Sequence, residues 1–330
     1  MFDIITFGSA TRDVFIKSKK FKTLKHKEFI TGQGLCFNLG SKIYLDDVFF
    51  ATGGGGTNTA ATFTKQGFKT AYVGRVGNDP GGVAIKEELD KMGIRHFISD
   101  DKERKTNYAI ILSVPNKGRT ILVYLGASHF FKKKDIPFKK LKAKWFYIAS
   151  LSGESSKTLL PIVSCAKKNN TKVAFNPGKI HIKMGIGKLK SVLSRLDVLI
   201  LNQEEASMLA NIPYQKEREI FKKLDKYVPG IVVMTKGPKG VVVSDGKEIF
   251  QSGTFKEKRH IDRTGAGDAF GSGFVAGLIQ TGKIEQAIRL GSANGTSMVE
   301  FFGAKNGILT KNQFLKELRW RRFKIAKSKL

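Results

Sequence analysis

Residues 262–273 read Asp262-Arg263-Thr264-Gly265-Ala266-Gly267-Asp268-Ala269-Phe270-Gly271-Ser272-Gly273. The glycines and small residues leave backbone N–H groups uncovered, and the spacing of the apolar residues after Asp268 predicts a helix. Because a helix N-terminus is partially positive, it attracts anions. A carboxylate beside such an anion hole suits phosphoryl transfer to a hydroxyl, with the amides stabilising the phosphoryl charge and Asp268 taking the proton. A glycine-rich helix start that only packs tightly is the structural alternative.

A second glycine-rich stretch lies about two hundred residues upstream. It reads Gly53-Gly54-Gly55-Gly56-Thr57-Asn58-Thr59-Ala60, followed by Gly67 and by Gly77. The two stretches, in this order and spacing, resemble the two signatures of the ribokinase/PfkB carbohydrate kinase family, whose members phosphorylate hydroxyls of sugars, sugar acids or nucleosides with ATP. The resemblance runs from the first expected strand to about residue 310. Arg263 departs from it, because the family usually has a small residue, Thr or Pro there; the departure bears on nucleotide or cation contacts more than on catalysis.

The rest of the chain alternates β-rich runs with helical stretches, which predicts a mostly parallel sheet covered on both faces. The candidate strands are 4–7, 70–73, 145–148, 172–175, 198–201 and 231–234. The candidate helices are 57–65, 82–92, 155–168, 203–209, 216–224 and two more after Gly267 and Lys283, with a hairpin at 241–250 around Asp245-Gly246. We therefore expect an α/β fold. The resemblance implies a ribokinase-like three-layer sandwich that forms a single kinase domain over residues 1–330.

Two stretches, 12–50 and 106–125, do not follow this rhythm and are rich in β-branched and aromatic residues. Within the second, residues 107–112 and 120–125 resemble paired strands. The resemblance implies that both stretches form a small β-sheet lid, inserted in the domain, which covers the sugar and often pairs with a second subunit in a homodimer. Edge hairpins without a gating role remain the alternative. Residues 319–330, rich in Lys and Arg, are expected to form a terminal helix with a loose basic tail.

Composition indicates an ordinary globular protein: 41% of the 330 residues are apolar, enough for a large core. Cys36 and Cys165 are too few for a disulfide framework and suit a reducing cytoplasm. The apolar start at residues 2–8 lacks a basic region and is short for a signal peptide, and no run reaches the roughly 18 apolar residues of a membrane span. We expect a cytoplasmic protein with no membrane contact.

Charge is the compositional outlier, since 58 Lys and Arg against 28 Asp and Glu give a formal net charge of +30. A basic nucleic-acid-associated protein is therefore one alternative. The basic residues are spread along the chain, however, and no zinc-finger, RNA-recognition or basic-zipper pattern accompanies them. Residues 277–283 have Walker A spacing, but Ile284 replaces the required Ser or Thr and no strand precedes them. The five histidines show no metal spacing. These patterns favour a solvated basic surface over a nucleic-acid partner.

The run Asn202-Gln203-Glu204-Glu205 opens a helix directly after a buried strand, at the carboxyl edge of the sheet where ligands bind in open α/β folds. It resembles the family's Asn-x-x-Glu element, which organises magnesium and phosphate through water. The resemblance implies that Asn202 contacts nucleotide and that Glu205 holds Mg²⁺ through water. A plain capping box, with Asn202 as N-cap, is the alternative.

Further nucleotide contacts rest on the resemblance alone. The loop 235–240 follows another strand, and the family's equivalent runs beside the nucleotide, which implies contacts from Thr235 and Gly237. Asn294, on the last long helix, is expected to line the adenine pocket, with a surface polar residue as the alternative.

The acceptor site is expected from the N-terminal part. Asp13 matches the family's acidic residue that accepts hydrogen bonds from sugar hydroxyls, and Gly54, Gly55 and Asn58 match its sugar-contacting turn, where glycines allow close backbone approach and the amide reads a hydroxyl. Glu154 is a further substrate-binding candidate near the same sheet edge.

The resemblance also implies that Asp262 and Thr264 contribute to a monovalent-cation (K⁺) site beside the anion hole.

Together these patterns predict an ATP- and Mg²⁺-dependent phosphotransferase with an alcohol acceptor. Asp268 is the expected base, and the backbone of Gly265, Ala266 and Gly267, with the Asp268 amide, is the expected anion hole. A catalytically silent sugar- or nucleoside-binding regulator is the alternative, against which the intact Asp268 and Asn-x-x-Glu element argue. The resemblance implies that lid residues select the substrate, whether it is a sugar, a sugar acid or a nucleoside. Because these residues vary, a single sequence does not identify the substrate.

Overall fold

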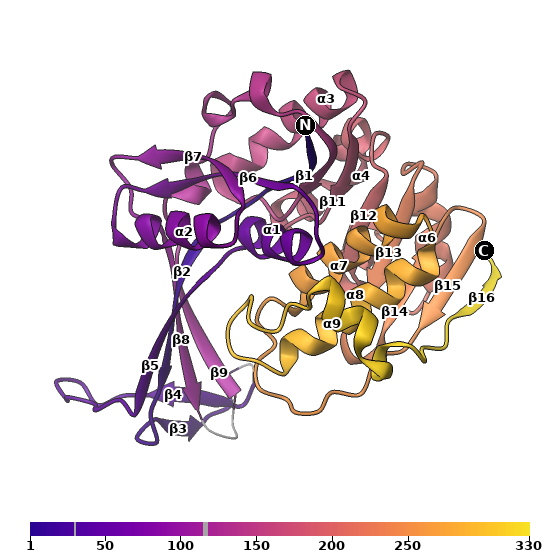
Figure 1. Ribbon diagram of the computed structural model, residues 1–330. Helices are drawn as coiled ribbons and strands as arrows, with labels where there is room; N and C mark the ends of the chain where they lie inside the picture. The colour runs from indigo at the N-terminus through magenta and orange to yellow at the C-terminus, as the bar shows by residue number, and fades with distance from the viewer. Residues whose placement is uncertain (30, 115–117) are drawn as a thin grey trace.

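A computed structural model describes residues 1–29, 31–114 and 118–330. Residues 30 and 115–117, inside the two expected lid stretches, lie outside the described residues. The described part contains a ten-stranded central sheet (Figure 1). In spatial order its strands are β16 (Ala326–Lys329), β15 (Glu248–Ser252), β14 (Val241–Ser244), β13 (Ile231–Thr235), β12 (Val198–Asn202), β11 (Lys172–Phe175), β10 (Ala143–Ile148), β1 (Phe2–Phe7), β6 (Thr70–Gly77) and β7 (Arg95–Asp101). Neighbours from β13 to β7 are parallel, and β14, β15 and β16 add an antiparallel edge.

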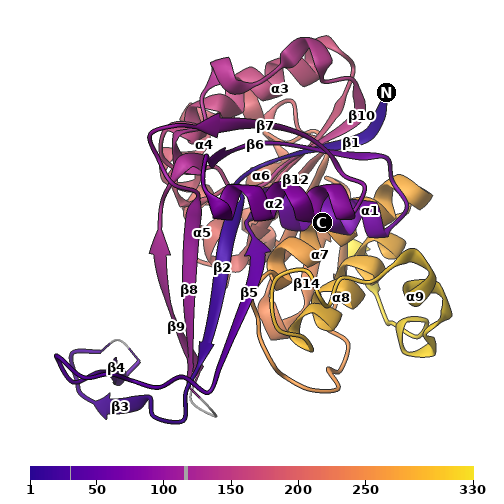
Figure 2. The same cartoon turned by 60° about the vertical axis from the view of Figure 1, so that its left-hand side comes forward.

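Helices cover both faces of this sheet (Figures 1 and 2). One face carries α1 (Gly55–Lys65), α2 (Pro80–Lys91), α7 (Ala266–Thr281) and α8 (Ile284–Val299), with α9 (Lys311–Lys316) beside them. The other face carries α3 (Leu159–Lys168), α4 (Lys179–Leu193), α5 (Gln203–Ala210) and α6 (Glu217–Asp225). Successive strand residues enter opposite cores: Ile4 packs in the cluster of α7 and α8, and Ile5 in the cluster of α3 to α6. Burial on both faces explains the continuous apolar strands, and the three-layer α/β prediction is confirmed.

The two stretches that broke the βα rhythm form a separate four-stranded sheet that projects from one side of the domain (Figures 1 and 2). Its strand order is β5 (Asp47–Gly53), β2 (Thr11–Lys17), β8 (Asn107–Val114) and β9 (Gly118–Tyr124). We call this sheet the lid. The expected pairing within residues 106–125 is confirmed, because β8 and β9 run antiparallel. At the far end of the lid, β3 (Lys22–Lys25) and β4 (Gln33–Cys36) form a small hairpin sheet of their own.

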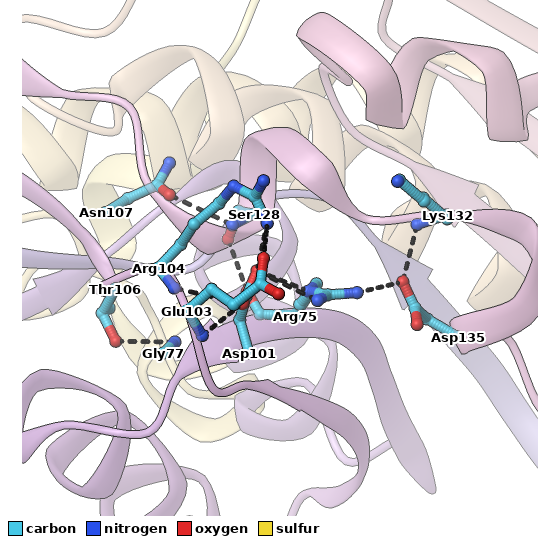
Figure 3. Close-up of polar contacts among 10 residues, drawn as sticks. All are labelled: Arg75, Gly77, Asp101, Glu103, Arg104, Thr106, Asn107, Ser128, Lys132 and Asp135. Atoms are coloured by element: carbon cyan, nitrogen blue, oxygen red, sulfur yellow. Dashed lines mark hydrogen bonds and ion pairs between the residues drawn. The ribbon is translucent and has the colours of Figure 1, made fainter.

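A polar network fixes the base of the lid to the central sheet (Figure 3). Arg75 of β6 forms ion pairs with Asp101 of β7 at 3.0 Å and with Asp135 at 2.7 Å. The Ser128 hydroxyl donates to the Arg75 carbonyl at 2.7 Å, while the Ser128 N–H donates to Asn107 Oδ1 at 3.2 Å. Since Asn107 is the first residue of β8, this lid strand starts from a fixed position relative to β6 and β7.

The structure corrects the expected C-terminal end. Residues 319–330 do not form a helix with a loose tail; apart from a short 3-10 turn at Leu318–Trp320, they lead into β16, which pairs antiparallel with β15. The open edge of the sheet offers unpaired backbone groups, and a lysine-rich strand can occupy an edge without inviting further pairing. Lys327 of β16 forms an ion pair with Glu248 of β15 at 2.7 Å.

Apart from the lid stretches, the C-terminal strand and short 3-10 turns, three described elements are absent from the sequence-based expectations: β7, α4 and α9. The helical pattern of α4 is interrupted by Gly185, whose φ of 71° is outside the helical region, so its apolar period is broken. Among the described residues, no helix is both long and apolar enough to cross a bilayer.

Candidate active site

The N-terminus of α7 presents free backbone donors. Gly265 caps the helix with a φ of 77°, a left-handed conformation that favours glycine, and a Cβ here would lie 2.9 Å from the Cβ of Ala304. The N–H of Ala266 donates to the carbonyl of Arg263 at 3.2 Å. The N–H groups of Gly265, Gly267 and Asp268 have no acceptor among the described residues, as expected at the start of a helix. Of the four amides expected to form the anion hole, only that of Ala266 is used within the described chain.

Asp268 is held at this helix start by a contact from the other glycine-rich segment. Asn58 of α1 donates from Nδ2 to Asp268 Oδ2 at 2.9 Å. A Cβ on Gly55 would lie 3.4 Å from Asp268 Oδ1, so the absence of a side chain at Gly55 leaves that oxygen reachable. Loss of hydration raises the pKa of Asp268, and the hydrogen bond from Asn58 partly offsets the increase. The structure thus brings three of the expected residues together.

Tyr147 of β10 belongs to the same group and was not expected from the sequence. Its hydroxyl is buried and has no hydrogen-bond partner among the described residues. Burial raises the pKa of Tyr147 well above its usual value, and the negative charge of Asp268 contributes. No local motif marks Tyr147, because it lies within an ordinary apolar strand.

Asp13 is a buried carboxylate without a protein partner. It lies on β2 opposite Ala51 of β5, is only 4% exposed, and its side chain makes no hydrogen bond or ion pair among the described residues. Burial raises the pKa of Asp13 to about 7; the positive charge of Lys305 opposes this increase and the negative charge of Glu88 adds to it. A buried carboxylate costs free energy unless something donates to it. Asp13 is therefore suited to receive hydroxyl groups of a ligand.

The glycine turn at 53–55 lies between the two carboxylates. A Cβ on Gly53 would collide with the Asp13 carboxylate, and one on Gly54, whose φ is 98°, would collide with the carbonyl of Ser9. The next residue of the turn, Gly55, approaches Asp268. Asn58, one helical turn later, has a buried Oδ1 with no partner in the described chain. Two acceptors without a partner in the described chain, the Asp13 carboxylate and Asn58 Oδ1, thus lie along the glycine-rich segment that approaches Asp268 Oδ1.

A cavity of about 480 Å³ opens beside the anion hole. Its size and mostly apolar walls suit a nucleotide base and sugar. Of the expected residues, Thr235, Gly237, Ala266 and Gly267 line it. The loop 235–240, expected beside the nucleotide, also contributes Pro238 and Gly240, and Arg263 lines the cavity as well. The lining residues that the sequence did not single out come from several elements and carry no shared motif: Thr254, Phe255, Lys256, Glu257, His260, Phe270, Ser292, Gly295, Thr296 and Val299. Arg263, the departure from the family pattern, thus faces the expected nucleotide side.

Asn202 and Glu205 form a capping box at the start of α5. The N–H of Glu205 donates to Asn202 Oδ1 at 2.9 Å, and the N–H of Asn202 donates to Glu205 Oε2 at 2.8 Å. Asn202 ends β12 directly beside Thr235, the last residue of β13. Burial raises the pKa of Glu205. Since the cap uses only one carboxylate oxygen, Glu205 Oε1 remains available, so the cap and a water-mediated magnesium contact are compatible.

Two expected residues are not brought to the site. Asn294 is fully buried: its Nδ2 donates to the carbonyl of Ala269 at 2.8 Å and its Oδ1 accepts from the N–H of Leu309 at 2.9 Å. It ties α8 to α7 and does not line the cavity. Glu154 forms an exposed ion pair with Lys157 at 2.7 Å, and that hydrogen bond lowers its pKa. The polar groups of both residues are therefore engaged by contacts within the chain.

Asp262 and Thr264, the expected K⁺ ligands, already have partners. Asp262 is buried, its Oδ1 accepts from the N–H and hydroxyl of Thr264 at 3.0 and 2.9 Å, and it forms an ion pair with Arg119 of the lid strand β9. Burial lowers the pKa of Arg119, and the positive charge of Arg263 lowers it further. Asp262 Oδ2 is buried without a hydrogen-bond partner in the described residues. With two guanidinium groups nearby, these residues do not fit a K⁺ ion.

Comparisons with known proteins show the family and the fold of the chain. The pattern of the pfkB family carbohydrate kinases matches residues 1–311. A ribokinase from Haemophilus influenzae is 28% identical over 275 residues, which cover 81% of this chain and 87% of that protein. An adenosine kinase from Schizosaccharomyces pombe is 27% identical over 277 residues, covering 78% and 82% respectively. The structure of Arabidopsis thaliana ribokinase complexed with ribose and ATP superposes with a TM-score of 0.78 at 22% identity, covering 97% of this chain and 99% of that one.

Proposed function

The chain belongs to the pfkB family of carbohydrate kinases, and on that premise we propose that it transfers the γ-phosphoryl group of ATP to a hydroxyl of a small sugar, sugar acid or nucleoside with Asp268 as the base. The observation that carries the proposal is the hydrogen bond between Asn58 and Asp268 at 2.9 Å, because it joins the two glycine-rich segments in one site. The relatives named ribokinase and adenosine kinase support a sugar or a nucleoside as the acceptor.

In the proposed mechanism the acceptor hydroxyl lies between Asp13 and Asp268. Asn58 holds Asp268 Oδ2, so Oδ1 can receive the hydroxyl proton as the oxygen attacks the γ-phosphorus. The raised pKa of Asp268 makes this carboxylate a stronger base than an exposed aspartate. The free N–H groups of Gly267 and Asp268 stabilise the charge on the transferring group, and the positive end of α7 adds to this.

ATP is proposed to occupy the cavity beside α7, with Thr235 and Gly237 along the nucleotide and Arg263 at the phosphates. Mg²⁺ would be held by phosphate oxygens and, through water, by Glu205, and it supplies neutralisation of the phosphate charge. The described residues contain no cluster of three or more His, Cys, Asp or Glu that could hold a metal, and Mg²⁺ commonly keeps several waters when it binds with substrate phosphates. The proposal includes no K⁺, because Arg119 provides the positive charge at Asp262.

The function is tested by measuring ADP release with the purified protein over a panel of sugars, sugar acids and nucleosides, each compared with ATP alone. We expect at least one compound to stimulate ADP release strongly. Binding of these compounds without stimulation would instead support a silent regulator.

Glu205 provides a prediction about magnesium. Glu205→Gln removes the charge but keeps an oxygen for the capping hydrogen bond, so α5 should remain folded. We expect the Mg²⁺ concentration for half-maximal activity to rise several-fold while the acceptor KM stays unchanged. The measurement is a Mg²⁺ titration at saturating ATP, with Glu204→Gln as the matched control. If the wild type, Glu205→Gln and Glu204→Gln all reach half-maximal activity at the same Mg²⁺ concentration, Glu205 has only the capping role.

We also propose that the lid pairs with the lid of a second copy. β9 is an edge strand, and Ile121, Leu122, Val123 and Tyr124 are 40–61% exposed on it. An exposed, apolar strand edge favours pairing with another chain. Sedimentation velocity at micromolar concentration should show a dimer, and Val123→Lys should shift it toward monomer. A monomeric wild type would contradict this part of the proposal.

A further inference from the structure

Lys305, Thr52 and Glu88 form a polar cluster next to the expected acceptor site. Lys305, in the loop after α8, is 7% exposed. Its ammonium group donates to the carbonyl of Thr52 at 3.2 Å, to the Thr52 hydroxyl, and to Glu88 Oε2 at 2.5 Å. The Thr52 hydroxyl in turn donates to the same Glu88 oxygen. Since an ammonium group has three N–H donors, all of those on Lys305 are used and none is left for a ligand.

The loop that carries Lys305 touches both halves of the site. The preceding residue, Ala304, packs against Gly265 at the expected anion hole: a Cβ placed on Gly265 would lie only 2.9 Å from the Cβ of Ala304. Lys305 itself reaches Thr52 on the lid strand β5. On its other side, Lys65 at the end of α1 donates to the carbonyl of Lys305 at 3.2 Å. One short loop therefore joins the anion hole, α1 and the lid.

Three charged side chains act on the Asp13 carboxylate. Lys305 comes from the loop after α8 and Glu88 from α2, whereas Arg12 is on the same strand as Asp13. Lys305 has the largest effect of the three and favours the ionised form, Glu88 opposes it, and Arg12 has the smallest effect. None of them makes a hydrogen bond to Asp13 within the described residues, so each acts on it through space.

We propose that Lys305 is a positioning residue of the acceptor site: it holds Thr52 of lid strand β5, which pairs with the Asp13 strand β2, against the loop that packs on the anion hole, and its buried positive charge favours the ionised form of Asp13. The proposal rests on the proposed role of Asp13 in binding acceptor hydroxyls. An ionised carboxylate accepts hydrogen bonds from hydroxyls with all its lone pairs, whereas a protonated one loses part of that capacity. Because the pKa of Asp13 is about 7, small changes in its surroundings decide its charge at neutral pH.

The two partners of the buried ion pair give opposite predictions. Lys305→Met removes a positive charge and should raise the pKa of Asp13 by about one pH unit, whereas Glu88→Gln removes a negative charge and should lower it. Both changes break the same pair, so both should lower the melting temperature. Lys305→Arg keeps the charge and should leave the pKa near that of the wild type. Lys144→Met, which removes the lysine of an exposed ion pair with Asp3, is the matched control.

The charge is read directly by ¹³C NMR of protein labelled at the aspartate carboxyl carbons, titrated from pH 5 to 9, with the Asp13 signal identified by its loss in Asp13→Asn. The second readout is the pH dependence of the acceptor KM, using whichever of D-ribose and adenosine gives the faster ADP release. We expect the two pH midpoints to move together, with kcat at high pH unchanged. Midpoints that stay fixed, or move the same way in Lys305→Met and Glu88→Gln, would overturn the proposal and leave a structural ion pair. Opposite shifts by NMR in a protein that phosphorylates no acceptor would uphold the charge assignment while contradicting the proposed function.

Discussion

Asp268→Asn should lower turnover by about 10²- to 10⁴-fold while the ATP dissociation constant stays within a few-fold of the wild-type value. Asparagine keeps the size of the side chain but removes its capacity to take a proton. The backbone N–H groups of Gly267 and of residue 268 remain in place, so the phosphates keep their donors. The measurement is single-turnover phosphoryl transfer together with ATP binding by calorimetry.

Asp225→Asn is the matched control for this experiment. Asp225 is a half-buried carboxylate whose pKa is raised to about 6 by burial. It accepts a hydrogen bond from the Ser244 hydroxyl of β14, on the antiparallel side of the sheet, away from the α7 N-terminus. Its substitution should leave turnover unchanged. Near-normal turnover in Asp268→Asn would contradict the assignment of the base.

Asp13→Ala should raise the acceptor KM by about 10- to 100-fold, which corresponds to the roughly 1.5–3 kcal/mol of one charge-assisted hydrogen bond. ATP affinity should not change, because Asp13 lies on the lid side of the glycine turn. The wild-type acceptor affinity should also fall as the pH drops through about 7, since protonation removes the charge that accepts the hydrogen bonds. In Asp13→Asn this pH step should disappear.

Acceptor KM and ATP affinity measured side by side decide this prediction. Asp100→Asn, an exposed aspartate paired with Lys86, is the control and should change neither. A normal acceptor KM combined with weakened ATP binding in Asp13→Ala would mean that acceptor and nucleotide have been assigned to the wrong ends of the site.

The sequence predicts the parts of the molecule whose pattern is local. Strands β1, β10 and β12 are continuous apolar runs because they are buried on both faces. The two glycine-rich segments can be recognised in the sequence because close backbone approach leaves few alternatives to glycine. β7 and β16 could not be read in this way. β16 contains no large apolar residue and owes its conformation to the open edge of β15.

In the candidate site, too, residues in local motifs could be predicted from the sequence, whereas residues placed by long-range contacts could not. Asn58 and Asp268 lie in segments with recognisable spacing, and the structure joins them. Tyr147, Arg119 and Lys305 have no such signal, because each depends on a contact between elements far apart in the chain. Asn294 was misjudged for the corresponding reason: its place on a helix near the cavity says nothing about the direction of its side chain, which points into the core.

The most direct test of the account follows the γ-phosphoryl group of labelled ATP onto the acceptor selected by the ADP-release panel. We expect the wild-type protein to label the acceptor hydroxyl in equal amount to the ADP formed and Asp225→Asn to do the same, whereas Asp268→Asn should transfer the label about 10²- to 10⁴-fold more slowly while still binding ATP. Label that appears in inorganic phosphate instead of the acceptor, or a near-normal rate of transfer in Asp268→Asn, would contradict the proposed function.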